Sequence, residues 1–204
     1  MDSQSTTRDR LISEGMRQLL AHGYEGVGIG PILKSVGVPK GSFYYFFQSK
    51  DDFVVAVIEA YEAKYQQLRE RFFTDSRLEP LDRLLAYFDA LEQEFRAEAP
   101  YAGCLYGVIA QSAAGRSAVV LDAVAQAFER WEKSIQGVLL AAQLNGDLAE
   151  NEDIEHLTAS IVEGYEGALI RAKAKEDVSA FTRFREFGLR RLISSPSAVA
   201  SSYP

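Results

Sequence analysis

The chain of 204 residues has little of what metal centres, disulfides and membrane segments are built from. It contains one cysteine, Cys104, and two histidines, His22 and His156. A single cysteine excludes an intramolecular disulfide and a multi-cysteine zinc site, so we expect no metal ion and no cofactor. No run of about eighteen apolar residues occurs, and no basic segment followed by an apolar one opens the chain. We therefore expect no membrane span and no secretion, and we place the protein in the cytoplasm.

The sequence also lacks the residue groups that mark an enzyme. The two histidines lie far apart, no glycine-rich phosphate-binding loop is present, and the carboxylates fall mostly on helix faces expected to be solvated. His22 stands beside Gly23 at the predicted end of a helix, where its side chain suits the negative end of the helix dipole. We therefore expect no catalytic site.

The hydrophobic pattern is helical throughout, and no strand pattern occurs. Apolar residues make up 47% of the chain, which is ample for a sizeable core, and they recur at three- and four-residue spacing. The spacing predicts helices over residues 7–23, 28–36 or 31–36, 40–47, 49–74, 80–100, a short segment after 103, 116–145, 152–175 and 178–194. We expect an all-α protein, with a disordered tail over residues 195–204, which are rich in Ser, Ala and Pro.

The stretch 36–53, VGVPKGSFYYFFQSKDDF, predicts a tight corner between two helices. Gly37 can adopt the left-handed conformation that ends one helix, and Pro39 suits the first position of the next. A short aromatic helix follows, and Ser49 can cap a third helix. At most two or three of the five consecutive aromatic residues can face the core. The others must lie on the surface, where tyrosine hydroxyls and lysines can meet phosphates and base edges.

The net charge of −7 is distributed unevenly along the chain. The first fifty residues hold six lysines and arginines against four acidic residues, whereas the remainder holds sixteen against twenty-five. A locally positive N-terminal part on an acidic body can dock on DNA in one orientation, because phosphates repel the body. The distribution is therefore compatible with a nucleic-acid partner.

Gly37, the run KGSFYYFF and the following SK-D-x-F resemble the DNA-binding signature of TetR-family transcriptional repressors. The resemblance implies a helix-turn-helix DNA-binding domain over residues 1–48 and an effector-binding and dimerisation domain over residues 49–194. It implies a homodimer that binds a palindromic operator in double-stranded DNA and is released by a small molecule. The implied DNA contacts are Gly28, Lys40, Gly41, Ser42, Tyr44, Tyr45 and Lys50. Pro39 and Phe46 replace residue types that are common in the family, which leaves the base contacts open.

The predicted body offers an effector pocket and a dimerisation surface. Apolar stripes that must converge, and that include polar tips able to orient a ligand, predict an effector site at Phe88, Leu91, Cys104, Val108, Trp131 and Tyr165. Small residues on one face of the helix over 152–175 would let another helix approach closely; they are Gly164, Gly167 and Ala168. The last helix carries more apolar surface than one side normally buries. The segment EGALIRAKAKED resembles the dimerisation segment of TetR-family proteins.

Cys104 lies in PYAGCLYG at the predicted start of a helix, where the dipole favours a thiolate. Together with VPKGSFY, this segment is similar to a TetR subgroup that responds to electrophiles, like the repressor of N-ethylmaleimide reductase. The alternative is that Cys104 is a small buried apolar residue.

One other class of function fits the same pattern. An all-helical adaptor protein could use the helix-turn-helix as a protein-binding surface rather than as a DNA-binding surface. A gel-shift assay against the DNA that flanks the gene would discriminate the two.

Overall fold

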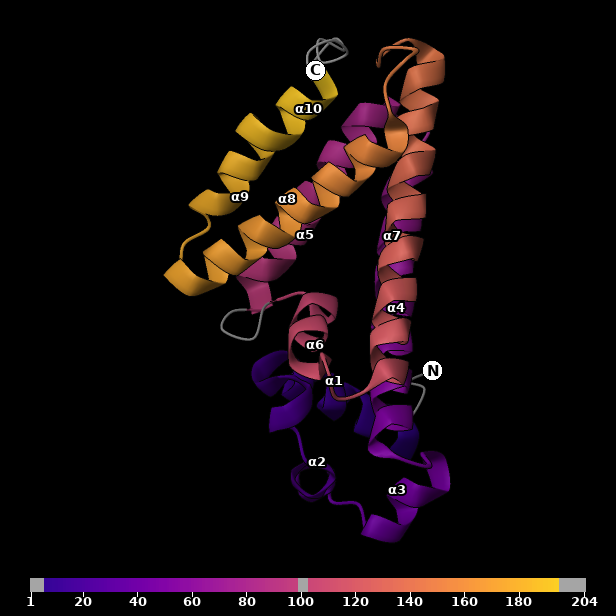
Figure 1. The fold of residues 1–204 in the computed structure, drawn as a ribbon, viewed down its shortest axis with the longest axis vertical. Helices are drawn as coiled ribbons and strands as arrows, with labels where there is room; N and C mark the ends of the chain where they lie inside the picture. The colour runs from indigo at the N-terminus through magenta and orange to yellow at the C-terminus, as the bar shows by residue number, and fades with distance from the viewer. Residues whose placement is uncertain (1–5, 99–102, 195–204) are drawn as a thin grey trace. The chain divides into compact units, whose positions relative to one another are not determined.

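A computed structural model describes residues 6–98 and 103–194 of the chain. The predicted tail at 195–204 and the predicted helix end at Pro100 lie outside these ranges. The described residues form α1 (Thr7–Gly26), α2 (Ile29–Val36), α3 (Lys40–Phe46), α4 (Lys50–Phe73), α5 (Pro80–Glu98), α6 (Leu105–Ala113), α7 (Ala118–Asn145), α8 (Ile154–Lys175), α9 (Ser179–Arg183), the π-helix η1 (Phe184–Leu189) and α10 (Arg190–Ser194), as labelled in Figure 1. No strand occurs in the described ranges, and the all-α prediction is confirmed. None of these helices combines the length and apolarity that crossing a membrane requires.

The described residues group into two compact units. The first unit lies within Met1–Tyr65 and Gly103–Glu129, and the second within Gln66–Ala102 and Arg130–Pro204. The long helices α4 and α7 each contribute residues to both units. The domain boundary expected near residue 48 stays a prediction, but α6 and the start of α7 group with the N-terminal helices.

Local sequence signals account for the ends of α1. Thr6 and Asp9 form a reciprocal capping box, in which the Thr6 hydroxyl accepts from the Asp9 amide and the Asp9 carboxylate accepts from the Thr6 amide. Gly23 has a φ of 68°, which breaks the helical path where the sequence predicted the helix to end. The chain then resumes a helical turn, and α1 ends at Gly26.

The corner between α2 and α3 is built as the sequence predicts. Gly37 adopts the left-handed conformation, with φ 67° and ψ 35°, and its amide donates to carbonyls at the end of α2. Pro39 has an extended ψ of 150° and precedes α3 rather than occupying its first position, and α3 begins at Lys40, as the predicted range 40–47 has it. Phe43, Phe47 and Phe53 bring three buried rings together with centroids 5.0–5.3 Å apart, and they hold α3 against α4.

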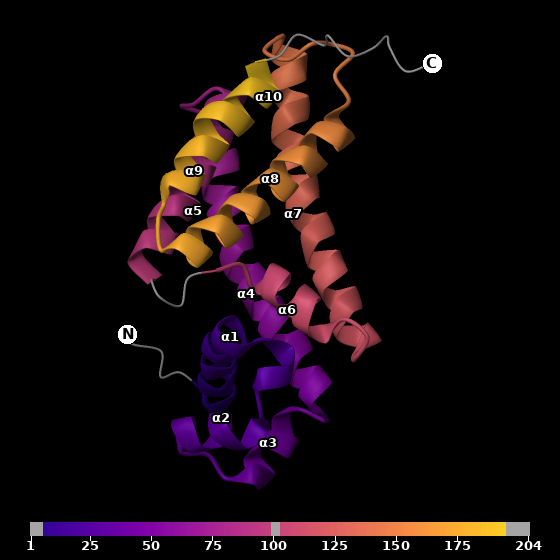
Figure 2. The same ribbon diagram turned by 60° about the vertical axis from the view of Figure 1, so that its left-hand side comes forward.

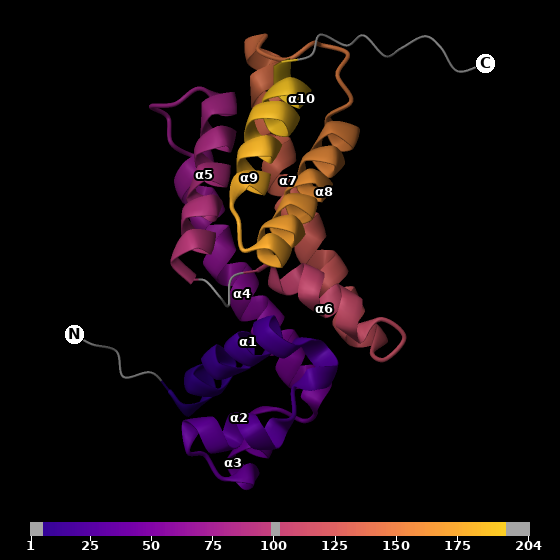
Figure 3. The same ribbon diagram turned by 90° about the vertical axis from the view of Figure 1, so that its left-hand side faces the viewer.

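The long helix α4 begins and ends within one residue of the prediction. The Ser49 hydroxyl accepts from the Asp52 amide at 3.0 Å, and the Asp52 carboxylate accepts from the Gln48 amide at 2.8 Å. These bonds satisfy amides that would otherwise have no partner at a helix start. Elsewhere in the first unit, α6 packs on α1 (Figure 3).

The second unit has an aromatic core between α5, α8 and η1. Tyr165 on α8 contacts Phe88 on α5 at 5.2 Å between ring centroids and Phe184 on η1 at 5.8 Å. Helix α8 and the segment from α9 to α10 run side by side in Figure 2, in agreement with their contacts. The sequence predicted one continuous helix over 178–194; the structure contains a π-helical stretch at its centre.

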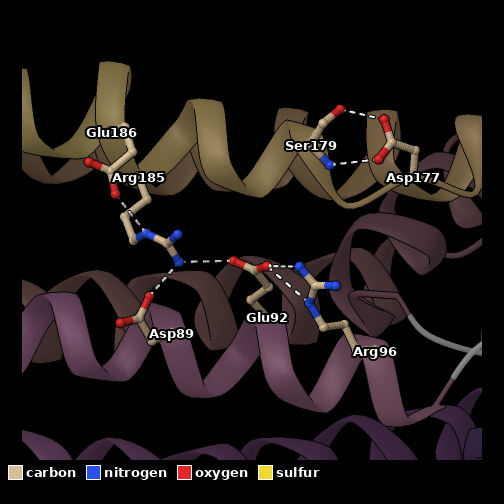
Figure 4. A network of polar contacts seen from close by, with 7 residues as sticks. All are labelled: Asp89, Glu92, Arg96, Asp177, Ser179, Arg185 and Glu186. Carbon is tan, nitrogen blue, oxygen red and sulfur yellow. Dashed lines mark hydrogen bonds and ion pairs between the residues drawn. The ribbon is translucent and has the colours of Figure 1, made fainter.

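An ion network attaches η1 to α5 (Figure 4). The Arg185 guanidinium donates to Asp89 at 2.7 Å and to Glu92 at 3.1 Å, and Glu92 also accepts from Arg96 at 2.6 Å. Glu92 is buried, so these donors compensate for the loss of its hydration. The π-helical stretch carries Arg185, and the network joins this stretch to α5.

Candidate DNA-binding surface and effector region

Helix α3 separates its aromatic residues into a buried and an exposed set. Phe43 and Phe47 are buried, whereas Tyr44 is 50% exposed and Tyr45 is 83% exposed. The inference that some of the five aromatic side chains must lie outside is therefore confirmed. Phe46 is half-buried and its ring meets that of Tyr45 edge-on at 4.9 Å. Two tyrosine hydroxyls are thus presented on the outer face of a short, well-anchored helix.

The other expected DNA contacts surround this face. Lys40 and Gly41 at the start of α3 are exposed, Ser42 is half-buried, and no atom lies within 4 Å of where a Gly41 side chain would begin. Gly28 is the cap of α2 and has no side chain to bond the first amides of that helix. Those amides are donors suited to a phosphate.

Two arginines of α1, which the sequence analysis did not single out, brace the corner. The Arg10 guanidinium donates to the carbonyl of Val36 at the end of α2. The Arg8 guanidinium lies over the Phe47 ring, 5.5 Å from its centroid. Their spacing of two positions on a helix gave no signal of these contacts, because both partners come from elements that follow in the chain.

Lys50 is less exposed than Lys40, the other lysine expected at DNA. Its ammonium lies 4.4 Å from the centroid of the Tyr24 ring. Partial burial lowers the pKa of Lys50, and the carboxylates of Asp51 and Glu25 act in the opposite direction. The cation therefore lies over an aromatic face, and two acidic groups are near enough to influence its pKa.

A group of buried and half-buried polar residues in the first unit, which we call the tyrosine cluster, includes Cys104. Its members are Tyr61, Glu62, Tyr65, Cys104 and Tyr106. The Tyr106 hydroxyl donates to the Glu62 carboxylate at 2.5 Å, and Glu62 is only 5% exposed. The ring of Tyr61 packs on those of Tyr65 and Tyr106 at 4.5 and 5.1 Å. Burial raises the pKa of Tyr61, and the neighbouring Cys104 raises it further.

Cys104 itself is 7% exposed and is the residue immediately before α6, as the sequence predicts. The other members of the tyrosine cluster were not predicted from the sequence as site residues. Tyr61 and Tyr65 lie at helical spacing on α4, and Tyr106 follows Cys104 by two positions. A polar atom on an otherwise apolar stripe was the available signal.

The remaining expected effector residues fall into separate groups. Val108 lies on the side of α6 that faces α1, near Gly23. Phe88, Trp131 and Tyr165 belong to the second unit, where Tyr165 contacts the other two rings at 5.2 and 5.8 Å. Leu91 is also buried in that unit. The structure thus brings together the three aromatic members in one unit, while Cys104 and Val108 belong to the other.

The face expected to mediate dimerisation is divided between internal packing and exposed residues. Ala168 is buried, and a side chain at Gly164 would begin 3.3 Å from Phe184 of the same chain. These two small residues therefore serve packing within the protomer. The exposed apolar side chains are Ile170 at 52% and Phe187 at 63%, and a side chain at Gly167 would begin in open space, more than 4 Å from the elements around α8.

Across residues 6–98 and 103–194, no cluster of three or more His, Cys, Asp or Glu side chains is arranged to hold a metal ion.

Comparison with known proteins identifies both parts of the chain. Residues 11–57 match the family model "Bacterial regulatory proteins, tetR family", and residues 80–187 match "Tetracyclin repressor-like, C-terminal domain". The transcriptional regulator AcuR of Cereibacter sphaeroides is 34% identical over 182 residues, which cover 88% of this chain and 83% of AcuR.

Solved structures agree with this match. The regulatory protein TetR from Rhodobacter sphaeroides has a TM-score of 0.85 at 32% identity and covers 92% of this chain and 98% of its own. The reduced form of Escherichia coli NemR has a TM-score of 0.82 at 25% identity, covering 95% and 99%. These relatives are transcriptional regulators rather than enzymes, which favours a DNA-binding role over the adaptor alternative. The helix-turn-helix geometry and these matches together show that the chain belongs to the TetR family of DNA-binding transcriptional regulators.

Proposed function

We propose that the protein is a repressor that binds a palindromic operator as a homodimer and is released by a small-molecule effector, in the cytoplasm. The observation that carries the DNA-binding assignment is the outer face of α3. Phe43 and Phe47 anchor the helix, which leaves Tyr44 and Tyr45 exposed beside Lys40. An anchored short helix with exposed hydrogen-bonding tips can enter a major groove and contact base edges and phosphates.

Fluorescence anisotropy with labelled duplexes from the DNA that flanks the gene tests this assignment. Tyr45→Ala removes the most exposed tyrosine of α3 and should weaken binding by at least about tenfold, the loss of one good base or phosphate contact in each protomer. Lys133→Ala is the control, because Lys133 is an exposed residue of α7 in the second unit. Wild-type protein that binds no duplex better than random DNA would refute the proposal.

The homodimer is proposed to use Gly167 and Ile170 of α8 together with Phe187 of η1. Exposed apolar side chains next to a glycine allow a symmetry-related helix pair to approach closely and bury both. Phe187→Glu should shift the sedimentation coefficient towards that of a monomer. Val119→Glu is the matched control, since Val119 is a similarly exposed apolar residue, at 58%, in the first unit. A dimer that survives Phe187→Glu with unchanged affinity would place the interface elsewhere.

The effector is proposed to act at Cys104 as a small electrophile. Two observations support this: the thiol neighbours Tyr61 in the tyrosine cluster, and NemR in its reduced form has a similar structure. A thiolate at Cys104 would add to the β-carbon of an unsaturated carbonyl compound, and a proton would then be taken up at the α-carbon to give a thioether.

N-ethylmaleimide serves as the probe for this step. It should release operator DNA from the wild type and fail to release it from Cys104→Ser, while both proteins bind DNA equally before treatment. Mass spectrometry should find one adduct per wild-type chain, because Cys104 is the single cysteine. Equal sensitivity of the two proteins would exclude the thiol mechanism and leave reversible binding of a ligand.

A further inference from the structure

Tyr24, which has no part in the proposed contacts, is held from three directions in the first unit. Its ring lies under the Lys50 ammonium, 4.4 Å from the ring centroid. Its hydroxyl donates to one carboxylate oxygen of Asp51 at 2.5 Å, and its backbone amide donates to the Ser112 hydroxyl at 2.8 Å. Tyr24 therefore links the end of α1 to the start of α4 and to α6.

The backbone at Gly23 makes the contact with α6 possible. Its φ of 68° lies where side chains are strained, and a side chain there would begin 2.8 Å from the Ser112 hydroxyl oxygen. The same hydroxyl donates to the carbonyl of Val108 at 2.7 Å, so its acceptor side is directed towards the Tyr24 amide. The position of the Tyr24 backbone is therefore set by α6.

Asp51 binds the hydroxyl end of the Tyr24 side chain and is itself held in place by Ser117. One oxygen accepts from Tyr24, and the second accepts from the Ser117 hydroxyl at 2.8 Å, just before α7. Glu25, the other acidic group that acts on Lys50, is paired with Arg116. Tyr24 is thus fixed at its backbone amide and at its hydroxyl, and the face of its ring is offered to the Lys50 ammonium.

We infer that Tyr24 is a positioning residue for DNA binding, which holds the Lys50 side chain over its ring in the place where Lys50 meets a DNA phosphate. The inference rests on Lys50 being one of the DNA contacts that the family resemblance implies, and it takes that contact to be with a phosphate. A lysine loses considerable side-chain freedom when it docks on a phosphate. An aromatic face that already restricts the side chain in the free protein reduces that loss, and it does so without itself touching DNA.

The matched pair that tests this is Tyr24→Phe against pentafluorophenylalanine at position 24. Both lose the hydroxyl and both keep the ring, but fluorination removes the negative face that attracts a cation. The fluorinated protein should bind operator DNA about two- to fivefold more weakly per protomer than Tyr24→Phe, the range expected for a partly exposed cation–π contact. In a Lys50→Gln background the same pair should bind equally, because the cation is gone.

Lys50→Gln alone tests the phosphate contact of Lys50 separately from the positioning role of Tyr24. It should lower the slope of log K against log salt by about 0.9 per protomer if Lys50 meets a phosphate. An unchanged slope would refute the phosphate contact and, with it, the positioning inference. A lowered slope combined with equal binding by the two ring variants would leave the phosphate contact standing and overturn the role of Tyr24. A loss on fluorination that persists without Lys50 would also overturn it, since that loss would be structural.

Discussion

Gly23→Ala should destabilise the protein more than any other single-methyl addition at its left-handed glycines. Two effects add at this position. The backbone conformation, with φ 68° and ψ −177°, is essentially restricted to glycine, and strain of this kind costs about 1–3 kcal/mol. The new methyl group would also lie 2.8 Å from the hydroxyl oxygen and 2.9 Å from the β-carbon of Ser112. Relief of that clash separates α1 from α6 and breaks the bond from the Tyr24 amide, worth about 1 kcal/mol.

The expected total is a loss of about 2–4 kcal/mol in the free energy of unfolding. Urea denaturation followed by circular dichroism at one fixed protein concentration measures it, because association would otherwise contribute to the apparent stability. Gly115→Ala is the matched control: Gly115 also has a positive φ, of 71°, in the same unit, but nothing lies within 4 Å of its would-be side chain. The control should show strain alone. A loss at Gly23 no larger than that at Gly115 would refute the proposed clash with α6.

Three further predictions concern other parts of the molecule. Phe43→Ala should lower the free energy of unfolding by about 3–5 kcal/mol, because it empties a fully buried ring site. Tyr45→Ala should change that free energy, measured in urea, by less than about 0.5 kcal/mol. Equal losses would contradict the division of α3 into a buried and an exposed face. The hydrogen bond from the neighbouring guanidinium holds the pKa of Glu14 at about 2, below its ordinary 4.5, so its stabilising contribution is present above pH 4.5 and is lost as the pH falls towards 2. Glu14→Gln should therefore be less stable than the wild type by about 0.5 kcal/mol at pH 7, and the difference should vanish in urea titrations near pH 2. Arg185→Met should lower the free energy of unfolding by about 1–3 kcal/mol, because it removes donors from a buried carboxylate. Arg190→Met, which breaks an exposed pair, should lower it by less than about 0.5 kcal/mol. Equal shifts of the melting temperature would show that the network does not stabilise the second unit.

Short-range chemistry explains which parts of the fold could be predicted. Gly37 and Ser49 each lie at a helix end, and the bonds that they make involve residues within four positions. Such signals do not depend on the rest of the molecule. The same holds for the corner between α2 and α3, whose residues carry the resemblance to the family.

Which face of a helix meets which neighbour was less predictable. The run of five aromatic residues required some to be exposed, but only packing against α4 selected Tyr44 and Tyr45. Val108 lies on an apolar stripe that could have faced an effector, yet the close approach of α6 to Gly23 directs it towards α1. Ala168 similarly resembled an interface residue, yet it is buried within the protomer.

The sequence by itself determined the helical class, the helix-turn-helix corner and the family, because helix periodicity and capping depend on residues that are near neighbours in the chain. Only the tertiary structure decided that Tyr24 would share Asp51 with Ser117, and that Lys50 would lie over the Tyr24 ring. The two partners of Asp51 are 27 and 66 positions away from it, and nothing in the local pattern selects one distant hydroxyl over another. These bonds depend on the packing of the end of α1, the start of α4 and the segment before α7, which brings the polar atoms within hydrogen-bonding distance of one another.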